Sequence, residues 1–426
     1  MERLPGFRDF YPEPLPQPDM WSADARQYVF NQWRSVARRY GFREYDGPPL
    51  EPLDLFTAKS GAEIVAQLYN FTDKGQREIS LRPEMTPTLA RMVAAHERNY
   101  KKPIKWFAAP QLFRYERQQK GRLREHFQFN ADIVGEADPS ADAELIALLI
   151  DTLRSFGLTS EDFVIRVSSR NAWHEFFKKQ NGDPAREYEF YQVIDKLDRE
   201  EPAVNERTLA SLGLSLTGVR SFIEQAEPTA ELQSILDNLT ARGLQTFVKV
   251  DYGIIRGLAY YTGVVFEAFD CKGDFRAIAG GGRYDNLVNL LSGGKVNLPA
   301  LGFGMGDVVL MELLKARQRL PRFGGAIDAV CLIENELARP DSLKLIQELR
   351  DAGLAVEFTL TPAKPDKQFK RAQELGAGFT FKVERLPNGE LVVKIKDLKT
   401  RLERAVGYAE AVAQLAGIPR QGLTIG

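Results

Sequence analysis

The order of the secondary-structure patterns constrains the fold of this chain most. Strand-like sequence is interrupted from about residue 172 to 245 by charged, helix-favouring sequence, and strand character resumes at Thr246-Phe-Val-Lys-Val250. Glycine-rich strands then continue to Gly302-Phe-Gly-Met-Gly306, and a helix is predicted over 308–315. A helix-rich segment between two parts of one β-rich region indicates a module inserted into a sheet-containing domain, which we place at residues 1–320.

A second domain is predicted at the C-terminal end. Pro321-Arg-Phe-Gly-Gly325 has the composition of a linker. The sequence beyond it alternates between strand and helix patterns: strands at 327–333, 354–360, 379–383 and 391–396, and helices at about 341–352, 366–375 and from about 399. Such alternation predicts a small separate α/β domain over residues 326–426.

Local patterns place further elements in the first domain. Val29, Trp33, Val36 and Tyr40 recur at helical spacing before Gly41, which predicts a helix over 25–40. Prolines 48 and 49 keep 42–51 extended. A helix is expected to start at Thr86-Pro87, with the threonine as its cap. We also expect strands over 106–116 and 127–134, joined by a charged turn, and a helix over 140–156.

Composition limits the functional classes. The 426 residues include 57 Lys and Arg against 58 Asp and Glu, a formal net charge of −1, so any site for a polyanion must be a local patch. There is no apolar run of 18 residues, no signal-peptide pattern and no metal-ligand spacing among two cysteines and three histidines. The sequence therefore predicts a soluble cytoplasmic protein without a structural metal site.

A basic hairpin is the first candidate for chemistry. Arg114, Arg117, Lys120, Arg122 and Arg124 surround one acid, Glu116, in the turn between the strands predicted at 106–116 and 127–134. Guanidinium groups bind phosphate oxygens in pairs, so this turn suits a triphosphate or a nucleic-acid end. The alternative is a solvated charged turn.

The strand that follows has two different faces. Period-2 alternation places Phe127, Phe129, Ala131 and Ile133 on one face and Gln128, Asn130 and Asp132 on the other. An apolar back with amide and carboxylate groups in front, beside a basic hairpin, indicates a small-molecule site.

A second polar segment carries Arg256 and the pair Tyr260-Tyr261, and the run Gly280-Gly-Gly-Arg283 follows. Glycines allow the backbone to approach a flat ligand closely. The spacing is not that of a P-loop. Alternatively, one or both tyrosines are buried with a satisfied hydroxyl.

These motifs together resemble the histidyl-tRNA synthetases, which are class II aminoacyl-tRNA synthetases. The resemblance covers the whole chain and rests on Leu4-Pro-Gly-Phe-Arg-Asp9, Leu81-Arg-Pro-Glu-Met-Thr86, the Phe113-Arg-Tyr-Glu-Arg117 hairpin, Arg256-Gly-Leu-Ala-Tyr-Tyr-Thr-Gly263 and Gly280-Gly-Gly-Arg-Tyr-Asp285. It implies an α+β fold: an antiparallel-sheet catalytic core with a helical insertion, and a C-terminal α/β anticodon-binding domain. It also implies a homodimer formed partly through residues 42–51, and a reaction of ATP, Mg²⁺, L-histidine and tRNA(His).

The resemblance also assigns roles to residues. Glu84, Met85 and Thr86 correspond to the loop that holds the histidine amino group; Gln128 corresponds to a carboxylate contact; Asp132, Tyr260 and Tyr261 correspond to the imidazole pocket. Arg114 and Arg256 correspond to the catalytic arginines near the α-phosphate and also contact histidine. Glu116, Arg122 and Arg283 complete the ATP site that the resemblance implies.

Two positions depart from the family pattern. Ala259 replaces the usual acid before the tyrosine pair, and Val309 stands where the third class II motif carries an arginine for the γ-phosphate. Arg122 or Arg283 is the candidate for the missing charge. Two other functions stay open: a catalytically silent paralogue that binds histidine as regulatory subunit of ATP phosphoribosyltransferase, and a non-catalytic RNA-binding module. The retained residues 326–426 and Arg114 argue against the first, and the net charge of −1 argues against the second.

Overall fold

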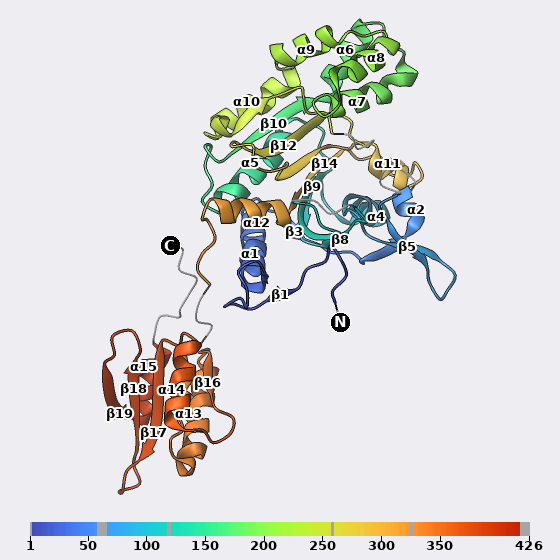
Figure 1. The fold of residues 1–426 in the computed structure, drawn as a ribbon. Helices are drawn as coiled ribbons and strands as arrows, with labels where there is room; N and C mark the ends of the chain where they lie inside the picture. Colours follow the sequence, from blue (N-terminus) through green and yellow to red (C-terminus); the bar gives the residue numbers. More distant parts are fainter. Residues whose placement is uncertain (1, 58–65, 117–120, 257–259, 324–326, 418–426) are drawn as a thin grey trace. The chain divides into compact units, whose positions relative to one another are not determined.

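A computed structural model describes residues 2–57, 66–116, 121–256, 260–323 and 327–417 (Figure 1). The chain forms two compact units, one of Met1–Phe10 with Ala25–Arg319 and one of Tyr11–Asp24 with Leu320–Gly426. A short ribbon near the N-terminus pairs β1 (Phe10–Tyr11) with β2 (Trp21–Ser22).

A large, mainly antiparallel sheet forms the centre of the first unit. Its strand order is β11-β10-β12-β13-β14-β9-β7-β3, and β8 also pairs with β9. The strands are β3 (Arg43–Glu44), β7 (Ile104–Ala108), β8 (Gln111–Phe113), β9 (Glu125–Val134), β10 (Phe163–Ser169), β11 (Val248–Val250), β12 (Val264–Asp270), β13 (Ala279–Arg283) and β14 (Ala300–Gly306). Among the described strands of this sheet, only β10–β11 and β3–β7 pair in parallel. The expected antiparallel-sheet core is confirmed.

Helix α1 (Ala23–Arg39) covers the apolar face of β9. Trp33 is fully buried and stacks on Phe129 with ring centroids 5.6 Å apart, and Phe30 meets Phe127 at 5.2 Å. Gly41 has φ +77° just beyond the helix, a conformation that glycine adopts without strain. The apolar back of β9 predicted from alternation is therefore confirmed.

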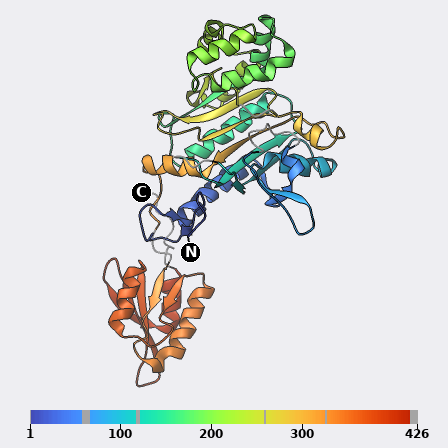
Figure 2. The same cartoon turned by 45° about the vertical axis from the view of Figure 1, so that its right-hand side comes forward.

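Other elements of the first unit surround this sheet (Figure 2). They are α2 (Leu53–Thr57), α4 (Thr86–His96), η1 (Glu97–Asn99), α5 (Ser140–Arg154), α11 (Leu287–Leu291), α12 (Asp307–Ala316) and a small sheet of β4 (Leu50–Pro52), β5 (Tyr69–Thr72) and β6 (Glu78–Leu81).

Two local predictions in this unit are wrong. Thr86 is already the first residue of α4, Met85 occupies the cap position, and no side chain caps the helix. The strand expected over 106–116 is divided into β7 and β8 because Pro110 has no N–H for a continuous ladder.

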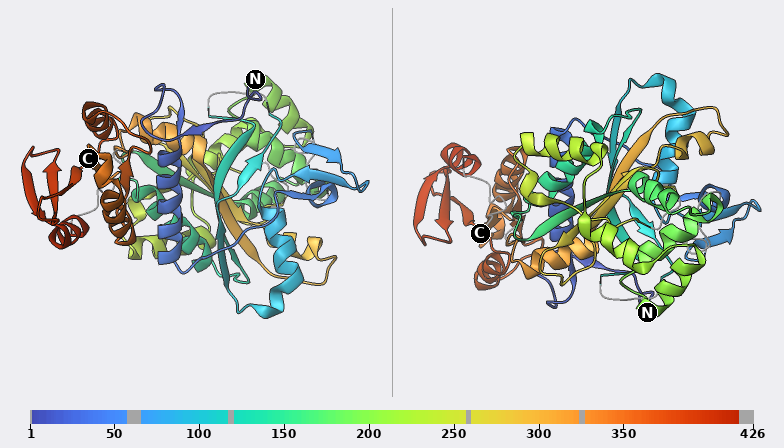
Figure 3. Two further views of the ribbon diagram at one scale, coloured as in Figure 1. Left: turned by 90° about the horizontal axis from the view of Figure 1, so that it is seen from below. Right: turned by 90° about the horizontal axis from the view of Figure 1, so that it is seen from above.

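The helices between β10 and β11 correspond to the segment for which the sequence predicts an insertion. They are α6 (Arg170–Lys179), η2 (Pro184–Arg186), α7 (Glu187–Lys196), α8 (Pro202–Ser211), α9 (Leu216–Gln225) and α10 (Ala230–Ala241), and η3 (Gln245–Phe247) leads back to the sheet. Figure 3 shows α1 in front in the view from below and the insertion helices in front in the view from above.

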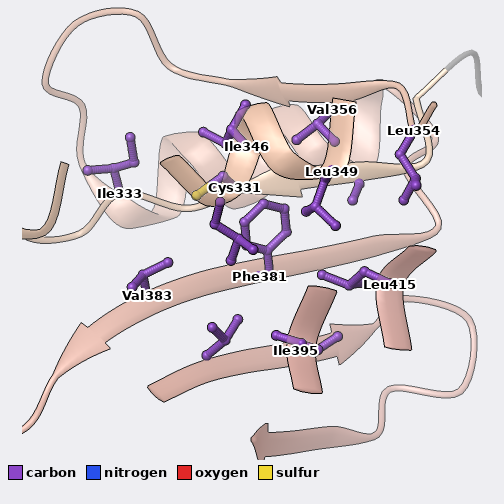
Figure 4. Packing of buried hydrophobic residues seen from close by; sticks show 14 residues of the cluster. Cys331, Ile333, Ile346, Leu349, Leu354, Val356, Phe381, Val383, Ile395 and Leu415 are labelled. Carbon is purple, nitrogen blue, oxygen red and sulfur yellow. The ribbon is translucent and has the colours of Figure 1, made fainter. Parts of the chain in front are cut away.

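The second unit contains a mixed sheet with the order β16-β15-β17-β18-β19. Its elements are β15 (Ala329–Cys331), η4 (Glu336–Ala338), α13 (Arg339–Asp351), β16 (Val356–Phe358), α14 (Pro365–Glu374), β17 (Phe379–Arg385), β18 (Leu391–Asp397), β19 (Glu403–Gly407) and α15 (Tyr408–Ala416). Phe381, Leu349 and Ile395 pack together in its core (Figure 4).

The prediction of a helix from about residue 399 is also wrong. Residues 403–407 form β19, which pairs with β18 from Val392 to Lys396, and the helix begins only at Tyr408. Pairing with a neighbouring strand outweighs the helix preference of Glu, Arg and Ala in this segment.

Candidate active site

A cavity of about 720 Å³ lies over the polar face of β9, β13 and β14 in the first unit. The arginines among its described lining residues are Arg114, Arg122, Arg199, Arg256 and Arg276, and the acids are Glu116 and Glu267. Arginines outnumber acids, so this cavity is a local basic patch on a chain of almost zero net charge. Such a patch attracts phosphate groups.

Two glycines of β14 make room for the polar side chains of β9. A Cβ atom at Gly302 would lie 1.9 Å from Asp132 Oδ1, and one at Gly304 would lie 2.7 Å from the Gln128 side chain. Gln128 and Asp132 therefore share the face that the alternation predicts, and Gln128 lines the cavity. The glycine alternation in β14 is what leaves this face open to larger groups.

Asp132 is buried and accepts a hydrogen bond of 2.5 Å from the Tyr284 hydroxyl. Burial raises the pKa of Asp132 to about 7, although the Tyr284 hydrogen bond opposes the shift. This carboxyl therefore titrates near neutral pH. A tyrosine from the Gly-Gly-Arg-Tyr-Asp motif thus orients a carboxylate from a different strand.

Glu84 and Tyr260 form a second carboxyl–tyrosine pair. The Tyr260 hydroxyl donates to Glu84 Oε2 at 2.8 Å, and both side chains are buried. Burial raises the pKa of Glu84, while Arg114 and Tyr260 oppose the shift. Among the described residues, Glu84 Oε1 has no hydrogen-bond partner.

The two pairs lie close together. The Tyr260 ring is 6.0 Å from the Tyr284 ring and 5.0 Å from the Tyr261 ring. The alternative prediction of a buried, satisfied tyrosine hydroxyl is thus correct for Tyr260, but its partner is a carboxylate from the predicted site.

The Arg256 side chain lies in the same region, and its backbone has a left-handed conformation. Its φ is +52°, its Nη1 donates to Glu267 Oε1 at 3.0 Å, and its Cζ lies 5.3 Å from the Tyr261 ring centroid. A Cβ at Gly280 would lie 1.5 Å from Arg256 Nη1. Gly280 therefore provides the space in which this guanidinium lies, a use of glycine that the sequence predicts only in general terms.

The hairpin contributes part of its charge to the cavity. Arg114 Nε donates to the Pro83 carbonyl at 2.9 Å, and Arg122 pairs with the buried Glu116 at 2.6 Å. Arg124 lies over the Tyr115 ring at 4.2 Å and is not among the described lining residues. Arg117, Lys120 and the departure at Ala259 lie outside the described residues.

Arg283 and Met85 do not occupy the places expected of them. Arg283 is buried, pairs with Asp142 at 2.5 Å and donates to the carbonyls of Glu136 and Asp138. Since Gly280 faces the cavity, strand alternation directs Arg283 to the opposite face, away from an ATP site. Met85 is fully buried, with its sulfur 3.8 Å from Arg82 Nη1, so its side chain belongs to the core.

Some lining residues were not predicted from the sequence. His126 lines the cavity, and burial together with Arg114, Arg8 and Arg122 lowers its pKa to about 3, so it is neutral. Because His126 lies two residues before Gln128 on the same strand, alternation places both side chains on the same face, and this spacing could have identified His126 as a lining residue. Arg276 and Arg199 come from a β12–β13 connection and from the insertion, where no local pattern marks them.

A buried ion network connects the N-terminal segment to the floor of this site. Arg8 pairs with Glu125 at 2.6 Å and with Asp307 at 2.8 Å, and Asp307 also accepts the Phe127 N–H at 3.0 Å. Val309, two residues beyond Asp307, lines the cavity. The position that departs from the family pattern is therefore an apolar part of the wall.

Comparison with known proteins agrees with this geometry. The histidyl-tRNA synthetase family model matches residues 17–307, and the anticodon binding domain model matches residues 329–417. A histidine–tRNA ligase of Opitutus terrae is 44% identical, covering 97% of this chain and 98% of its own, and one of Thermoplasma volcanium is 36% identical, covering 96% and 100%.

Solved structures share the fold. A histidyl-tRNA synthetase from Nostoc sp. PCC 7120 superposes with a TM-score of 0.74 at 22% identity, covering 95% of this chain and 97% of its own. A Bacillus halodurans protein described as an ATP phosphoribosyltransferase regulatory subunit/histidyl-tRNA synthetase gives 0.70 at 22% identity, covering 87% and 96%. With two family models that match most of its length and relatives that span it almost entirely, the chain belongs to the histidyl-tRNA synthetase family.

Proposed function

We propose that this chain attaches L-histidine to tRNA(His), with ATP as the energy source and histidyl-adenylate as the intermediate. The observation that carries the proposal is that a cluster of carboxyl–tyrosine pairs lies next to an arginine-lined cavity. Carboxyl–tyrosine pairs lie within reach of one another around Tyr260, and arginines line the adjoining cavity. The carboxyl–tyrosine pairs suit a small polar amino acid, and the arginine-lined cavity suits a nucleoside triphosphate.

Histidine is proposed to bind at the carboxyl–tyrosine end. Glu84 Oε1 is available to accept from the α-ammonium group, and Thr86 borders the same loop. Gln128 is proposed to contact the substrate carboxylate. Asp132 and Tyr261 are proposed to bind the two imidazole nitrogens, because a carboxylate on one nitrogen leaves the other to meet a hydroxyl.

The arginines are proposed to act on the phosphates. The histidine carboxylate attacks the α-phosphorus in line and pyrophosphate leaves, so catalysis requires positioning and neutralisation of charge on phosphate oxygens. Arg114 and Arg256 are proposed to contact the α-phosphate, and Arg122 with Glu116 to border the nucleotide. We add Arg276, which lines the same cavity as Val309. Mg²⁺ is proposed to arrive with ATP, where it neutralises phosphate charge.

A second step transfers histidine to tRNA. The unit that matches the anticodon binding domain model is proposed to bind the anticodon region, and residues 42–51 are proposed to contribute to a homodimer. Leu50 in this region is 40% exposed. Light scattering of the purified protein tests the dimer. No described helix is long and apolar enough to span a bilayer. We propose that the reaction takes place in the cytoplasm.

Histidine-dependent exchange between ATP and pyrophosphate tests the proposal directly, followed by charging of tRNA(His). Exchange with histidine and none with other amino acids is the expected result. Histidine binding without exchange would instead identify the regulatory-subunit function, which no particular feature of this site favours.

A further inference from the structure

Arg170 holds the backbone that carries the proposed catalytic arginine. It is the first residue of α6, where the insertion begins, and its side chain is buried. Its guanidinium donates to the carbonyls of Ile255 at 3.3 Å, Tyr261 at 2.8 Å and Arg256. Its own N–H donates to the Gly263 carbonyl at 3.0 Å. One residue therefore binds the chain on both sides of 257–259.

The backbone at Arg256 requires such support. A φ of +52° is unfavourable for a residue with a side chain and persists only where the surrounding structure holds it. The conformation has a consequence for the site, because it brings the Arg256 guanidinium over Gly280 and to Glu267 in the cavity. Hydrogen bonds from a charged donor to buried carbonyls are stronger than neutral ones.

The same guanidinium also contacts the insertion. Arg170 Cζ lies 5.1 Å from the ring centroid of Tyr191 in α7, a cation–π distance. Nearby, Trp173 of α6 donates from Nε1 to the Tyr252 carbonyl at 3.1 Å, just before the Arg256 segment. Helix α6 is thus bonded to the backbone that leads to Arg256, and α7 contacts α6 through the Arg170 side chain.

We propose that Arg170 is a positioning residue for adenylation, which holds the backbone at Ile255, Arg256 and Tyr261 so that Arg256 reaches the α-phosphate, and which connects that placement to the helical insertion. This inference rests on the proposed function. If it is correct, loss of the Arg170 contacts lowers kcat through Arg256. A change at the Tyr261 carbonyl appears separately, in the KM for histidine, while the KM for ATP is largely preserved.

The decisive experiment is a double-mutant cycle between the two arginines, measured by histidine-dependent ATP–pyrophosphate exchange. Arg256→Ala is expected to lower kcat by roughly 10²–10³-fold, the size of one lost charge-stabilising group. Arg170→Lys keeps the charge, but its compact ammonium does not reproduce the planar fork that bonds three carbonyls, and it is expected to lower kcat by about 10-fold or more with the KM for ATP within about threefold. In the Arg256→Ala background, Arg170→Lys is expected to lower kcat by less than about threefold.

Two further variants complete the test. Arg186→Lys is the matched control, because Arg186 also lies in the insertion but donates to the Ser211 carbonyl at 2.6 Å and pairs with Glu189 at 2.8 Å. It is expected to leave kcat unchanged. Tyr191→Ala removes the ring beside Arg170 from a half-buried position and is expected to lower kcat in the same direction, again only when Arg256 is present. This variant decides the question if Arg170→Lys fails to fold in thermal unfolding.

The outcomes separate the two levels of inference. Equal loss of kcat from Arg170→Lys with and without Arg256 would overturn the positioning role while leaving the proposed function intact. Unchanged kcat in Arg170→Lys would also overturn the positioning role and leave the proposed function intact. Absence of exchange in the unaltered protein would overturn the proposed function and this inference together.

Discussion

Asp132 is the residue whose protonation is most open to measurement. Burial raises the pKa of Asp132 to about 7. In the folded protein the carboxyl group therefore stays protonated at pH values between the ordinary pKa of an aspartate and about 7, and it is fully ionised only above pH 7. A protonated carboxyl resembles an amide in shape and in hydrogen bonding. The effect of replacing Asp132 therefore depends on pH.

Asp132→Asn should raise the KM for histidine most above pH 7 and little below about pH 6, where the native carboxyl is itself neutral. The ratio of variant to native KM cancels the titration of histidine itself. Asp132→Ala should cost roughly 10–150-fold in histidine affinity, the range for a lost hydrogen bond to a charged group, and should change the KM for ATP little. A ratio that stays constant from pH 5.5 to 8.5 would contradict this assignment.

Arg276 is expected to supply positive charge where Val309 supplies none. β13 and β14 are antiparallel, with Ala279 opposite Met305, so Arg276 leaves the sheet at the edge where β14 runs into α12. Arg276→Ala should raise the KM for ATP by about 10-fold, and adding Val309→Arg should restore it.

Lys272→Ala is the control for this prediction, because Lys272 is an exposed cation of the same loop outside the described cavity lining. Binding of a stable histidyl-adenylate analogue, which lacks the β- and γ-phosphates, should not change in Arg276→Ala. Equal losses for ATP and the analogue would show that the variant disturbs the site generally.

At the scale of elements, β14 determines how much space β9 has for polar side chains. Gly302 and Gly304 lie against Asp132 and Gln128, whereas a Cβ at Gly306 would meet only the His126 ring, at 3.9 Å. The three positions form a graded series along one strand. They allow steric effects on the site to be separated from effects on the strand itself.

Gly302→Ala should displace Asp132 and raise the KM for histidine by about 10-fold or more, with a stability loss of about 1–3 kcal/mol from overpacking. Gly304→Ala should displace Gln128 and also weaken histidine binding. Gly306→Ala should leave both properties close to native. Exchange kinetics and thermal unfolding of the three variants measure this, and an equal effect at all three positions would refute the steric explanation.

At the scale of the whole molecule, the two units should serve different steps. In the second unit the lining of a hollow includes Lys382, Lys394, Lys396 and Phe369, with Lys396 Nζ 5.2 Å from the Phe369 ring. The acids Glu334, Asp366 and Glu403 also line it, and Glu334 pairs with Lys382. Lysines beside a half-buried aromatic ring suit a single-stranded nucleic acid, since phosphates meet the cations and a base stacks on the ring.

The double substitution Phe369→Ala with Lys396→Ala should raise the KM for tRNA(His) in charging by about 10-fold or more, the value of one lost stacked base and one phosphate contact. Histidine-dependent exchange should stay native because histidine and ATP are proposed to bind in the first unit. Lys370→Ala, on the same helix but outside the described lining, is the control. Parallel loss of exchange and charging would argue against separate roles.

The sequence alone determined the features that follow from backbone periodicity. Alternation in β9 placed Gln128 and Asp132 together and Phe129 on the opposite face, because successive side chains of a strand point to opposite sides. The strand–helix order likewise predicted the second α/β unit, the motifs identified the family, and the family resemblance implied the antiparallel-sheet core. Prediction failed where pairing decides structure, as at 403–407, where β18 turns helix-favouring residues into a strand.

Only the tertiary structure decided which charged side chains meet. Arg283 and Arg276 lie seven positions apart and look equally basic in sequence, yet one is buried against Asp142 and the other lines the cavity. The hydroxyl of Tyr284 reaches Asp132 across 152 positions of sequence, and Arg8 reaches Asp307 across 299. Such contacts depend on strand order and register, which are set by packing of distant segments rather than by any local pattern.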